Sequence, residues 1–318
     1  MNHLKGVNLG GWLVLEKWMT PSVFKGTDAK NEYELAGTDR GRRVLKKHHQ
    51  TFITEGDFRW LRDKGYLLIR LPVGHWVFGD APPYVGAVKQ LDFAFQMAEK
   101  YDLQILLDLH GAPGAQNAAD HSGSGRPGLS AWLDSPDKKE ATIHVLERLV
   151  ERYNPSEALW GIELVNEPLA DRFGFKLVRF YRRTYRRLTK IAKPGLYIVF
   201  SDGFNPLFIT GALPRSKLHP VAIDCHFYQC FGRQNKQLSF EQHLRKARWR
   251  HWLIRFLGLW QPVIVGEWSA MLPFRPSPEL TQQYFNQQQI IHQEAIAQCY
   301  WNYKTEAGGR WNLRDMLE

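Results

Sequence analysis

The segment WGIELVNEPL, residues 160–169, begins as the apolar run of a buried strand and then places two glutamates, an asparagine and a proline among and after its apolar residues. Amphipathic stretches with helical spacing precede and follow it, at residues 138–153 and 173–193. The same alternation of a short β-rich segment with a helical stretch recurs along most of the chain. The β-rich segments are residues 6–9, 66–73, 103–110, 159–167, 196–202, 221–228, 262–269 and 296–303, and the other helical stretches are residues 56–64, 91–101, 240–257 and 278–297.

Strands that alternate with helices pair in parallel through right-handed crossovers. Eight such units in 318 residues, 44% of them hydrophobic, predict an α/β fold of the (β/α)8 TIM-barrel type, built as a single domain over residues 1–318. A doubly wound open sheet is the structural alternative, and it is disfavoured because no glycine-rich dinucleotide motif follows the first strand. The longest loop-like stretches, residues 16–54 and 111–135, follow the first and third strands, where barrel enzymes carry their active-site loops. We expect the second of them to fold over the barrel mouth.

Polar residues of several predicted strands share one face, because residues two apart in a strand point to the same side. They gather towards the carboxyl ends of the strands, where a barrel places its catalytic pocket. These residues are Arg70, Asp108, His110, Glu163, Glu167, Asp224, His226, Tyr228 and Glu267.

The deeper carboxylates of this set, Asp108, Glu163 and Asp224, are expected to form structural hydrogen bonds, because a buried carboxylate needs a partner such as Arg70 or a histidine. A lone histidine is more often a core residue, but His110 and His226 stand at strand ends beside carboxylates, which favours a functional role.

Glu167 and Glu267 stand at the ends of the fourth and seventh strands, so their carboxyl groups are expected to face each other across the mouth. They are followed by Pro168 and Trp268 rather than by compensating charges, which favours a catalytic role. Two carboxyl groups about 5–5.5 Å apart hydrolyse a glycoside with retention of configuration, whereas a separation of about 6.5–9.5 Å leads to inversion. The sequence leaves both separations open.

The surroundings of the two glutamates are expected to differ. Arg70 and the hydroxyl of Tyr228 would keep Glu267 ionised, while Glu167, with fewer positive neighbours, would keep its proton more easily. We therefore predict Glu167 as the acid/base and Glu267 as the nucleophile.

Seven segments extend this pattern over nearly the whole chain. In order they are GVNLGGWLVLEKWMTP (6–21), RLPVGHW (70–76), LDLHGAPGAQN (107–117), IELVNEP (162–168), DCHFYQCF (224–231), VGEWSA (265–270) and YWNYKTE (300–306). Together they resemble glycoside hydrolase family 5, a family of clan A retaining glycosidases, and most closely its exo-β-1,3-glucanase branch.

The resemblance implies the same roles for Glu167 and Glu267. It further implies that Asn166 bonds the sugar 2-hydroxyl and that Trp301 forms the platform under the sugar in the cleaved subsite. The other supporting residues that it implies are Arg70, His110, His226 and Tyr228. The other substrate-binding residues are Glu16, Asp120, Phe231 and Trp268. Glu16 and Asp120 match positions that hold the terminal glucose, and Phe231 matches one half of an aromatic clamp.

The implied activity is that of a retaining β-glycosidase that hydrolyses β-glucosidic bonds in β-1,3-glucan or β-glucan oligosaccharides by double displacement. The sequence departs from the glucanase pattern at Ala119, where the relatives carry the other clamp aromatic, and in a shorter connection between GEWSAML and IAQCYWNY. A β-1,4-endoglucanase, a glycolipid β-glucosidase or a transglycosylase on the same scaffold are therefore alternatives. The non-enzymatic alternative is a sugar-binding barrel, which is disfavoured because both carboxylates are present.

A metal-dependent hydrolase is a further alternative, with ligands from Asp108, His110, His226 and Glu267. It is disfavoured because no HxH pair follows the first strand and Arg70 would lie beside the metal. No cofactor is indicated.

The chain has 42 Lys and Arg against 32 Asp and Glu, a formal net charge of +10. Residues 179–193 and 245–256 concentrate the basic side chains, and a solvated helix face is the expected interpretation, with contact to an acidic surface such as nucleic acid as the alternative.

Three cysteines, Cys225, Cys230 and Cys299, form no disulfide framework or metal spacing. No segment has 18 uninterrupted apolar residues, and the N-terminal residues lack the apolar run of a signal peptide. A cytoplasmic location is expected, or secretion if a leader has been removed.

Overall fold

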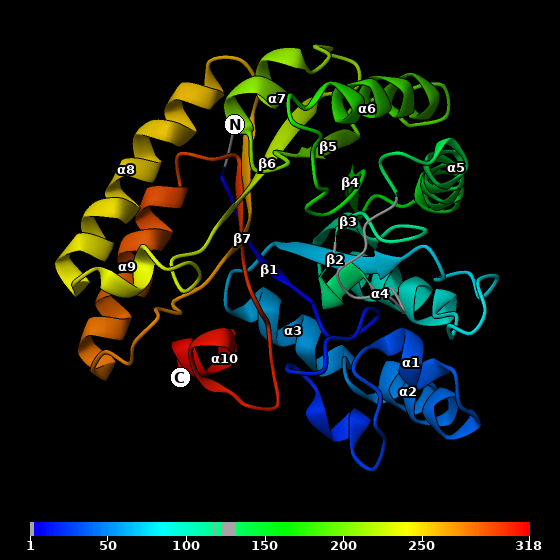
Figure 1. Cartoon of the computed structure of the whole chain (residues 1–318), viewed down its shortest axis with the longest axis horizontal. Helices are drawn as coiled ribbons and strands as arrows, with labels where there is room; N and C mark the ends of the chain where they lie inside the picture. The colour runs from blue at the N-terminus through cyan, green and yellow to red at the C-terminus, as the bar shows by residue number, and fades with distance from the viewer. Residues whose placement is uncertain (1–2, 118, 123–131) are drawn as a thin grey trace.

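The computed structural model describes residues 3–117, 119–122 and 132–318. Its centre is a closed barrel of parallel strands in the order β1 to β8, so the predicted (β/α)8 fold is confirmed (Figure 1). The strands are β1 Leu4–Asn8, β2 Leu68–Gly74, β3 Gln104–Gly111, β4 Leu159–Glu163, β5 Tyr197–Ser201, β6 Val221–Phe227, β7 Val263–Trp268 and β8 Ala297–Tyr300.

Helices surround the barrel and cover its apolar outer surface. Every helical stretch that the sequence predicts is present, with ends that shift by a few residues. These helices are α3 Glu55–Asp63, α4 Val88–Lys100, α5 Pro136–Tyr153, α6 Phe175–Leu188, α8 Phe240–Gly258 and α9 Pro278–His292. Among the described residues, none of the helices has both the length and the apolar character needed to cross a bilayer.

Residues 16–54 were predicted as a loop, and this was wrong. The segment contains η1 Pro21–Phe24, α1 Glu32–Ala36 and α2 Asp39–Thr51, which enclose a small apolar core of their own. The sequence also missed α7 Pro206–Ala212 and α10 Leu313–Leu317, together with the short 3-10 turns η2 Asp120–Ser122, η3 Asn235–Gln237 and η4 Gly309–Trp311. Of the predicted mouth loop at 111–135, residues 118 and 123–131 lie outside the described part of the chain.

Local sequence signals account for where the long helices begin. The Ser135 side chain accepts a hydrogen bond from the Lys138 amide, and Pro136 fills the first turn of α5. Ser239 and Gln242 form a reciprocal capping box at the start of α8. These caps satisfy backbone amides that a helix leaves without partners, so they set the starting points of the two longest helices of the described chain.

The barrel interior is layered. Its lower layer is apolar, and the residues two positions further along several strands are polar or small, as the two-residue period of a strand requires. The lower layer contains Leu68, Leu106, Ala222 and Ile264, and the corresponding residues above them are Arg70, Asp108, Asp224 and Gly266. The barrel is thus apolar at its amino end and becomes polar towards the carboxyl ends of its strands.

Gly266 leaves room for the carboxylate of Asp224, whose Oδ1 accepts the Gly266 amide at 2.6 Å. A Cβ at this position would lie 1.9 Å from Asp224 Oδ2, so a larger residue must displace the carboxylate or the strand.

We expect Gly266→Ala to lower the free energy of unfolding by about 2 kcal/mol, because overpacking a well-filled interior costs roughly this much. Gly211→Ala in α7 is the matched control, since a Cβ there meets nothing within 4 Å, and it should leave stability unchanged or raise it by up to about 1 kcal/mol. Urea unfolding of both variants measures the difference. Equal stability of the two would contradict this account of Gly266.

Candidate active site

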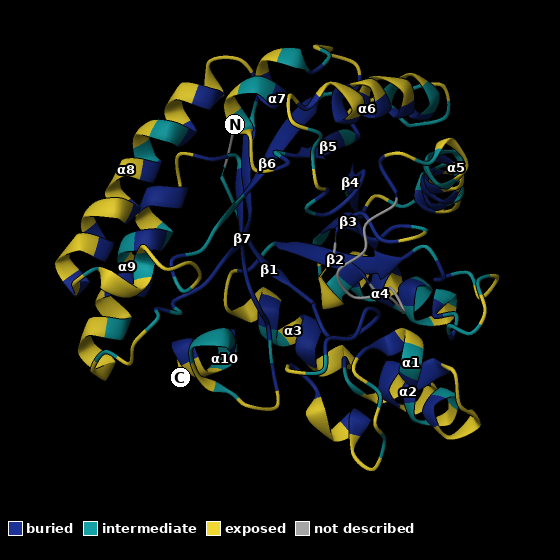
Figure 2. Cartoon of the chain, in the orientation of Figure 1, coloured by how far each residue is buried: buried dark blue, intermediate teal, exposed yellow. Residues whose placement is uncertain are grey.

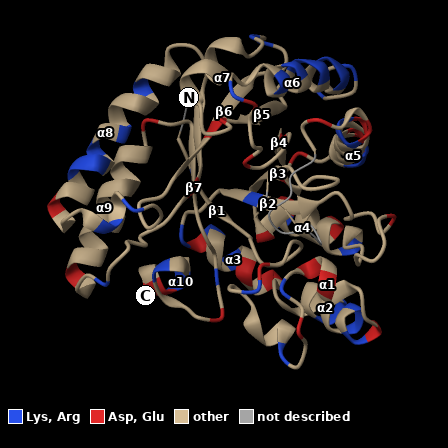
Figure 3. Ribbon diagram, in the orientation of Figure 1, with Lys and Arg blue, Asp and Glu red and all other residues tan. Residues whose placement is uncertain are grey.

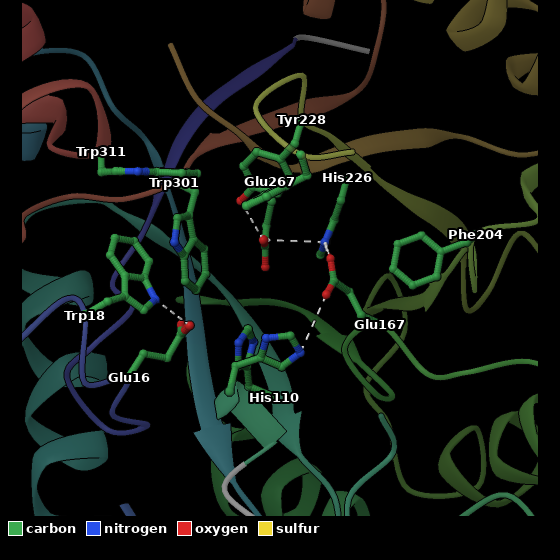
Figure 4. A pocket seen from close by; sticks show the side chains of 12 residues that line it. Glu16, Trp18, His110, Glu167, Phe204, His226, Tyr228, Glu267, Trp301 and Trp311 are labelled. Carbon is green, nitrogen blue, oxygen red and sulfur yellow. Dashed lines mark hydrogen bonds and ion pairs between the residues drawn. The ribbon is translucent and has the colours of Figure 1, made fainter. Parts of the chain in front are cut away.

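A cavity of about 590 Å³ opens at the carboxyl ends of the strands, a volume suited to a small ligand (Figure 4). Loops from distant parts of the chain converge on it, as expected for the top of a barrel. Its walls are Glu16, Trp18, His110, His121, Glu167, Phe204, His226, Tyr228, Phe231, Glu267, Trp301 and Trp311.

Arg70 lies fully buried on β2 below this cavity and connects the surrounding polar groups. Burial alone would lower the pKa of its guanidinium, but the carboxylates around it raise that pKa well above the usual range, so the group stays charged. Its contacts are Glu163 Oε2 at 2.8 Å, Asn166 Oδ1 at 2.8 Å, Asn8 Oδ1 at 3.0 Å, Glu267 Oε1 at 3.0 Å, Asp108 Oδ2 at 3.1 Å and Asp224 Oδ2 at 3.5 Å.

Glu267 is held at both carboxylate oxygens. Arg70 Nη1 donates to Oε1 at 3.0 Å, and the Tyr228 hydroxyl donates to Oε2 at 2.7 Å, so both contacts expected from the sequence are present. Burial and the nearby charge of Glu167 raise the pKa of Glu267, while His226 and Arg70 oppose that rise. The two hydrogen bonds fix the orientation of this carboxylate and leave it directed at the cavity (Figure 4).

Glu167 reaches the cavity through a turn rather than as part of a strand. The predicted strand 159–167 ends at Glu163, and the backbone of Glu167 is left-handed, with φ of 43°. Such a conformation costs a non-glycine residue about 1–3 kcal/mol and persists only where neighbouring groups hold it. The side chains of Asn117 and Gln116 do so, donating to the backbone oxygens of Glu167 at 3.0 Å and Asn166 at 2.9 Å.

The expectation that Glu167 has few positive neighbours was wrong. His226 Nδ1 lies 2.7 Å from Glu167 Oε1, and His121 Nε2 lies 3.6 Å from Oε2. Burial would raise the pKa of Glu167, but the hydrogen bond and charge of His226 lower it to about 2.

The pKa of His226 shifts in the opposite direction to that of Glu167. Burial would lower its pKa, but the charges of Glu267 and Asp224 raise it well above the ordinary histidine range, and the hydrogen bond to Glu167 adds to the rise. These directions place the proton on His226 and leave Glu167 ionised, so the prediction that Glu167 keeps its proton more easily than Glu267 was wrong. The hydrogen bond between His226 and Glu167 still lets the pair share one proton. The acid function predicted for Glu167 remains chemically available through this shared proton.

The separation of the two glutamates is short. One carboxylate oxygen of Glu167, one of Glu267 and a ring nitrogen of His226 lie within 4.8 Å of one another. This spacing leaves no room between the carboxylates for the attacking water of an inverting enzyme and favours direct attack by one of them.

The structure brings most of the predicted supporting residues to the same place. His110 Nδ1 bonds Asp108 Oδ2 at 2.7 Å, and its ring stacks against Trp301 with centroids 5.5 Å apart. Asn166 accepts from Arg70, and its Nδ2 has no protein partner among the described atoms. Glu16 and Phe231 also line the cavity.

Two predicted substrate-binding residues are placed elsewhere. Trp268 is buried in the core between the barrel and α9, where it packs against Phe285, His292 and Tyr300, because strand alternation turns it away from the side that Glu267 faces. Asp120 is exposed in η2 and does not line the cavity, although its neighbour His121 does.

Four residues that line the cavity were not predicted: Trp18, His121, Phe204 and Trp311. Trp18 and Trp311 pack with ring centroids 5.4 Å apart, and Trp18 Nε1 donates to Glu16 Oε2 at 2.9 Å. Trp18 lies in the segment 6–21, two residues after Glu16, which the sequence predicts to bind substrate. Trp18 could therefore have been predicted from this neighbour. No periodic pattern indicates Trp311, because it comes from a turn after the last strand.

Two groups of three side chains have the spacing of metal ligands, Glu163, Asp224 and His226 in one and Glu167, His226 and Glu267 in the other. The Arg70 guanidinium already contacts Glu163, Asp224 and Glu267. A bound cation would have to share these carboxylates with a fixed positive charge, which does not fit a metal centre.

Comparison with known proteins agrees with this geometry. The family model Cellulase (glycosyl hydrolase family 5) matches residues 27–307. A probable glucan 1,3-beta-glucosidase A of Aspergillus fumigatus is 36% identical over 282 residues, covering 84% of this chain and 65% of the relative. A glucan 1,3-beta-glucosidase of Pichia angusta is 33% identical over 288 residues, covering 85% of this chain and 65% of the relative.

The chain thus spans 65% of the length of each of these two relatives. Among solved structures, the rutinosidase of Aspergillus niger matches with a TM-score of 0.85 at 20% identity, covering 99% of this chain and 94% of that one, which shows a shared fold. The chain belongs to glycosyl hydrolase family 5.

Proposed function

We propose that the protein is a retaining β-glucosidase that hydrolyses β-1,3-glucan or its oligosaccharides. The observation that carries this proposal is the pair of carboxylates of Glu167 and Glu267, which approach within 4.8 Å in a cavity at the barrel mouth. Two relatives that are 36% and 33% identical to this chain over the matched residues are named glucan 1,3-beta-glucosidases, which supports the substrate.

The reaction has two steps. In the first, a carboxylate oxygen of Glu267 forms a bond to the anomeric carbon, the glycosidic bond breaks, and the shared His226–Glu167 proton passes from Glu167 to the leaving oxygen. In the second, Glu167 removes a proton from water, the water oxygen bonds the anomeric carbon, and Glu267 leaves as a carboxylate. Two inversions restore the original configuration.

The surrounding groups support these steps. Arg70 and Tyr228 hold the attacking carboxylate in one orientation, which removes the entropic cost of aligning it. Asn166 Oδ1 accepts from Arg70, and its Nδ2 is buried just outside the cavity wall without a partner among the described atoms, so this N–H is the group that would donate to the sugar 2-hydroxyl. Trp301, stacked on His110, offers a flat surface under the sugar ring.

The aromatic wall gives a place for further sugar units. Trp18, Trp311 and Phe231 form a continuous set in which Phe231 and Trp311 stack with centroids 6.2 Å apart. Phe231 is exposed at the rim, and Phe204, also exposed, lines the cavity beside Glu167 (Figure 4). These exposed rings would contact an oligosaccharide that extends out towards solvent.

Replacing the two glutamates tests the chemistry directly. We expect Glu267→Gln to abolish turnover of aryl β-glucosides, because no other group can form the covalent intermediate. Glu167→Gln should slow substrates with poor leaving groups by about 10²–10⁴-fold and those with good leaving groups much less, because only the former need a proton. Initial rates measured with a series of aryl β-glucosides of different leaving-group acidity give both results.

Glu157→Gln, at an exposed glutamate remote from the cavity, is the control and should match the wild type. Unchanged turnover in either test variant, or an inverted anomer as the first product by NMR, would refute the assigned roles.

The shared proton predicts a particular pH dependence. Because the pKa of His226 is raised, the alkaline fall of kcat/KM should lie well above the ordinary histidine range. His226→Asn leaves the proton on Glu167 alone, so this limb should move to lower pH. His121→Asn, which changes a histidine 3.6 Å from the same carboxylate, should leave the limb in place. If both variants shift it equally, the proton is not specific to the His226–Glu167 pair.

The aromatic rim predicts a selective effect on longer substrates. We expect Phe231→Ala to raise KM for laminarioligosaccharides about 2–10-fold, the loss of one stacking contact, with a smaller change for an aryl β-glucoside. Phe256→Ala, an exposed phenylalanine on α8 far from the cavity, serves as control. The same assays with cellooligosaccharides and a glucosylceramide check the linkage, and a higher kcat/KM on either would contradict β-1,3-glucan as the substrate.

A further inference from the structure

Figure 2 shows exposed residues along the outer face of α8. Several of them are large and apolar. Trp249, Trp252, Phe256 and Leu259 are 73%, 63%, 47% and 75% exposed. They follow one another at intervals of three or four residues, so they form a single stripe along the helix and its C-terminal end. We call these four residues the α8 stripe.

The α8 stripe is not needed to attach the helix to the barrel. The opposite face of α8 supplies its own buried apolar residues, Leu244, Ala247, Ile254 and Leu257. Arg250 adds polar contacts there, donating to the backbone oxygens of Phe227 at 3.1 Å and Tyr228 at 2.9 Å. The helix is therefore apolar on both sides, and only one side has a partner within the chain.

Basic side chains predominate around the α8 stripe, and an acidic one, Glu294, lies 3.6 Å from His251 of the helix. Between Gln242 and Gln261 the sequence contains no Asp or Glu. Figure 3 shows basic residues along α8. Arg245, Lys246, Arg248 and Arg255 of this helix are exposed and form no ion pair with any described residue, although Lys246 donates to Asn235 at 2.7 Å. On α6, Arg183 and Arg187 pair with Glu140 and Glu147 of α5, whereas its other arginines form no ion pair with a described residue. The positive charge of α8 is thus left for a ligand outside the chain.

Exposed apolar and basic side chains also continue past the end of α8. Trp260 lines a shallow hollow together with Arg215 and Lys217, and the neighbouring Leu218 is 57% exposed. The apolar and basic groups therefore cover one continuous flank of the barrel rather than an isolated turn.

We propose that this flank binds the surface of an anionic phospholipid membrane. Tryptophan and phenylalanine beside arginine are the side chains that a membrane interface accommodates, with the rings among the acyl chains and the guanidinium groups at the phosphates. A second copy of the chain fits less well, because a two-fold contact through α8 would bring the unpaired arginines of both copies together. No residue of α8 lines the catalytic cavity, so membrane binding leaves the barrel mouth open.

Flotation with lipid vesicles tests the proposal. The wild-type protein should float with vesicles of phosphatidylcholine mixed with phosphatidylglycerol, bind weakly to phosphatidylcholine alone, and be released by high salt. The double variant Trp249→Ala with Trp252→Ala should lower the partition of the protein onto vesicles at least about tenfold, since the area that each ring would bury in the membrane is lost. Arg245→Gln with Arg248→Gln and Arg255→Gln should lower it roughly a hundredfold, at about fivefold for each charge near the surface.

A triple change on α2 is the matched control. Arg43→Gln with Lys46→Gln and Lys47→Gln removes the same charge from an exposed helix face and should bind vesicles as the wild type does. Turnover of a soluble aryl β-glucoside should be unchanged in all these variants, which separates this proposal from the proposed function and reports correct folding.

Three results would overturn the proposal. They are absence of wild-type binding to anionic vesicles at low salt, equal loss of binding in the α2 and α8 triple variants, and a wild-type dimer in light scattering that Trp249→Ala with Trp252→Ala converts to a monomer.

Discussion

The polar half of the barrel depends on one buried cation. Arg70 extends from β2 to partners on five other elements: Asn8 of β1, Asp108 of β3, Glu163 of β4, Asp224 of β6 and Glu267 of β7. Removing one partner from such a network leaves a charge without compensation and costs about 3–5 kcal/mol. Stability and the orientation of the Glu267 carboxylate therefore depend on the same side chain, so the strands cannot shift without disturbing the cavity.

The barrel and its polar layer could be predicted from the sequence because both follow from periodicity. Alternation of strands with helices predicted the fold, and the two-residue period of the strands correctly grouped His110 with Asp108 and His226 with Asp224. The expected contacts of Glu267 with Arg70 and Tyr228 are also present, because Arg70 lies within β2, Glu267 near the end of β7 and Tyr228 directly after β6, so the barrel sets the direction of all three side chains.

What the sequence could not supply depends on turns and on contacts between distant segments. Glu167 leaves the strand register through a left-handed turn, so its closeness to His226 could not be read from residue spacing. Trp311 reaches Trp18 only after the chain has closed the barrel, and α1, with five residues, is too short to show a helical period. The 13 residues of α2 do carry an amphipathic pattern, so this helix could have been predicted from the sequence. Trp268 shows the opposite error: its position beside Glu267 suggested a sugar contact, but alternation along β7 directs it into the core.

Most of the basic side chains that give the net charge of +10 lie away from the cavity. Among the described residues, the cavity wall contains three carboxylates, Glu16, Glu167 and Glu267, and no Lys or Arg, and the Arg70 guanidinium beneath the wall is bonded to carboxylates. A neutral sugar gains nothing from a positive surface potential, whereas the positive charge that develops at its anomeric carbon is stabilised by nearby carboxylates. With arginines on the outer helices and glutamates in the mouth, the positive surface potential and the acidic cavity lie in separate regions of the barrel.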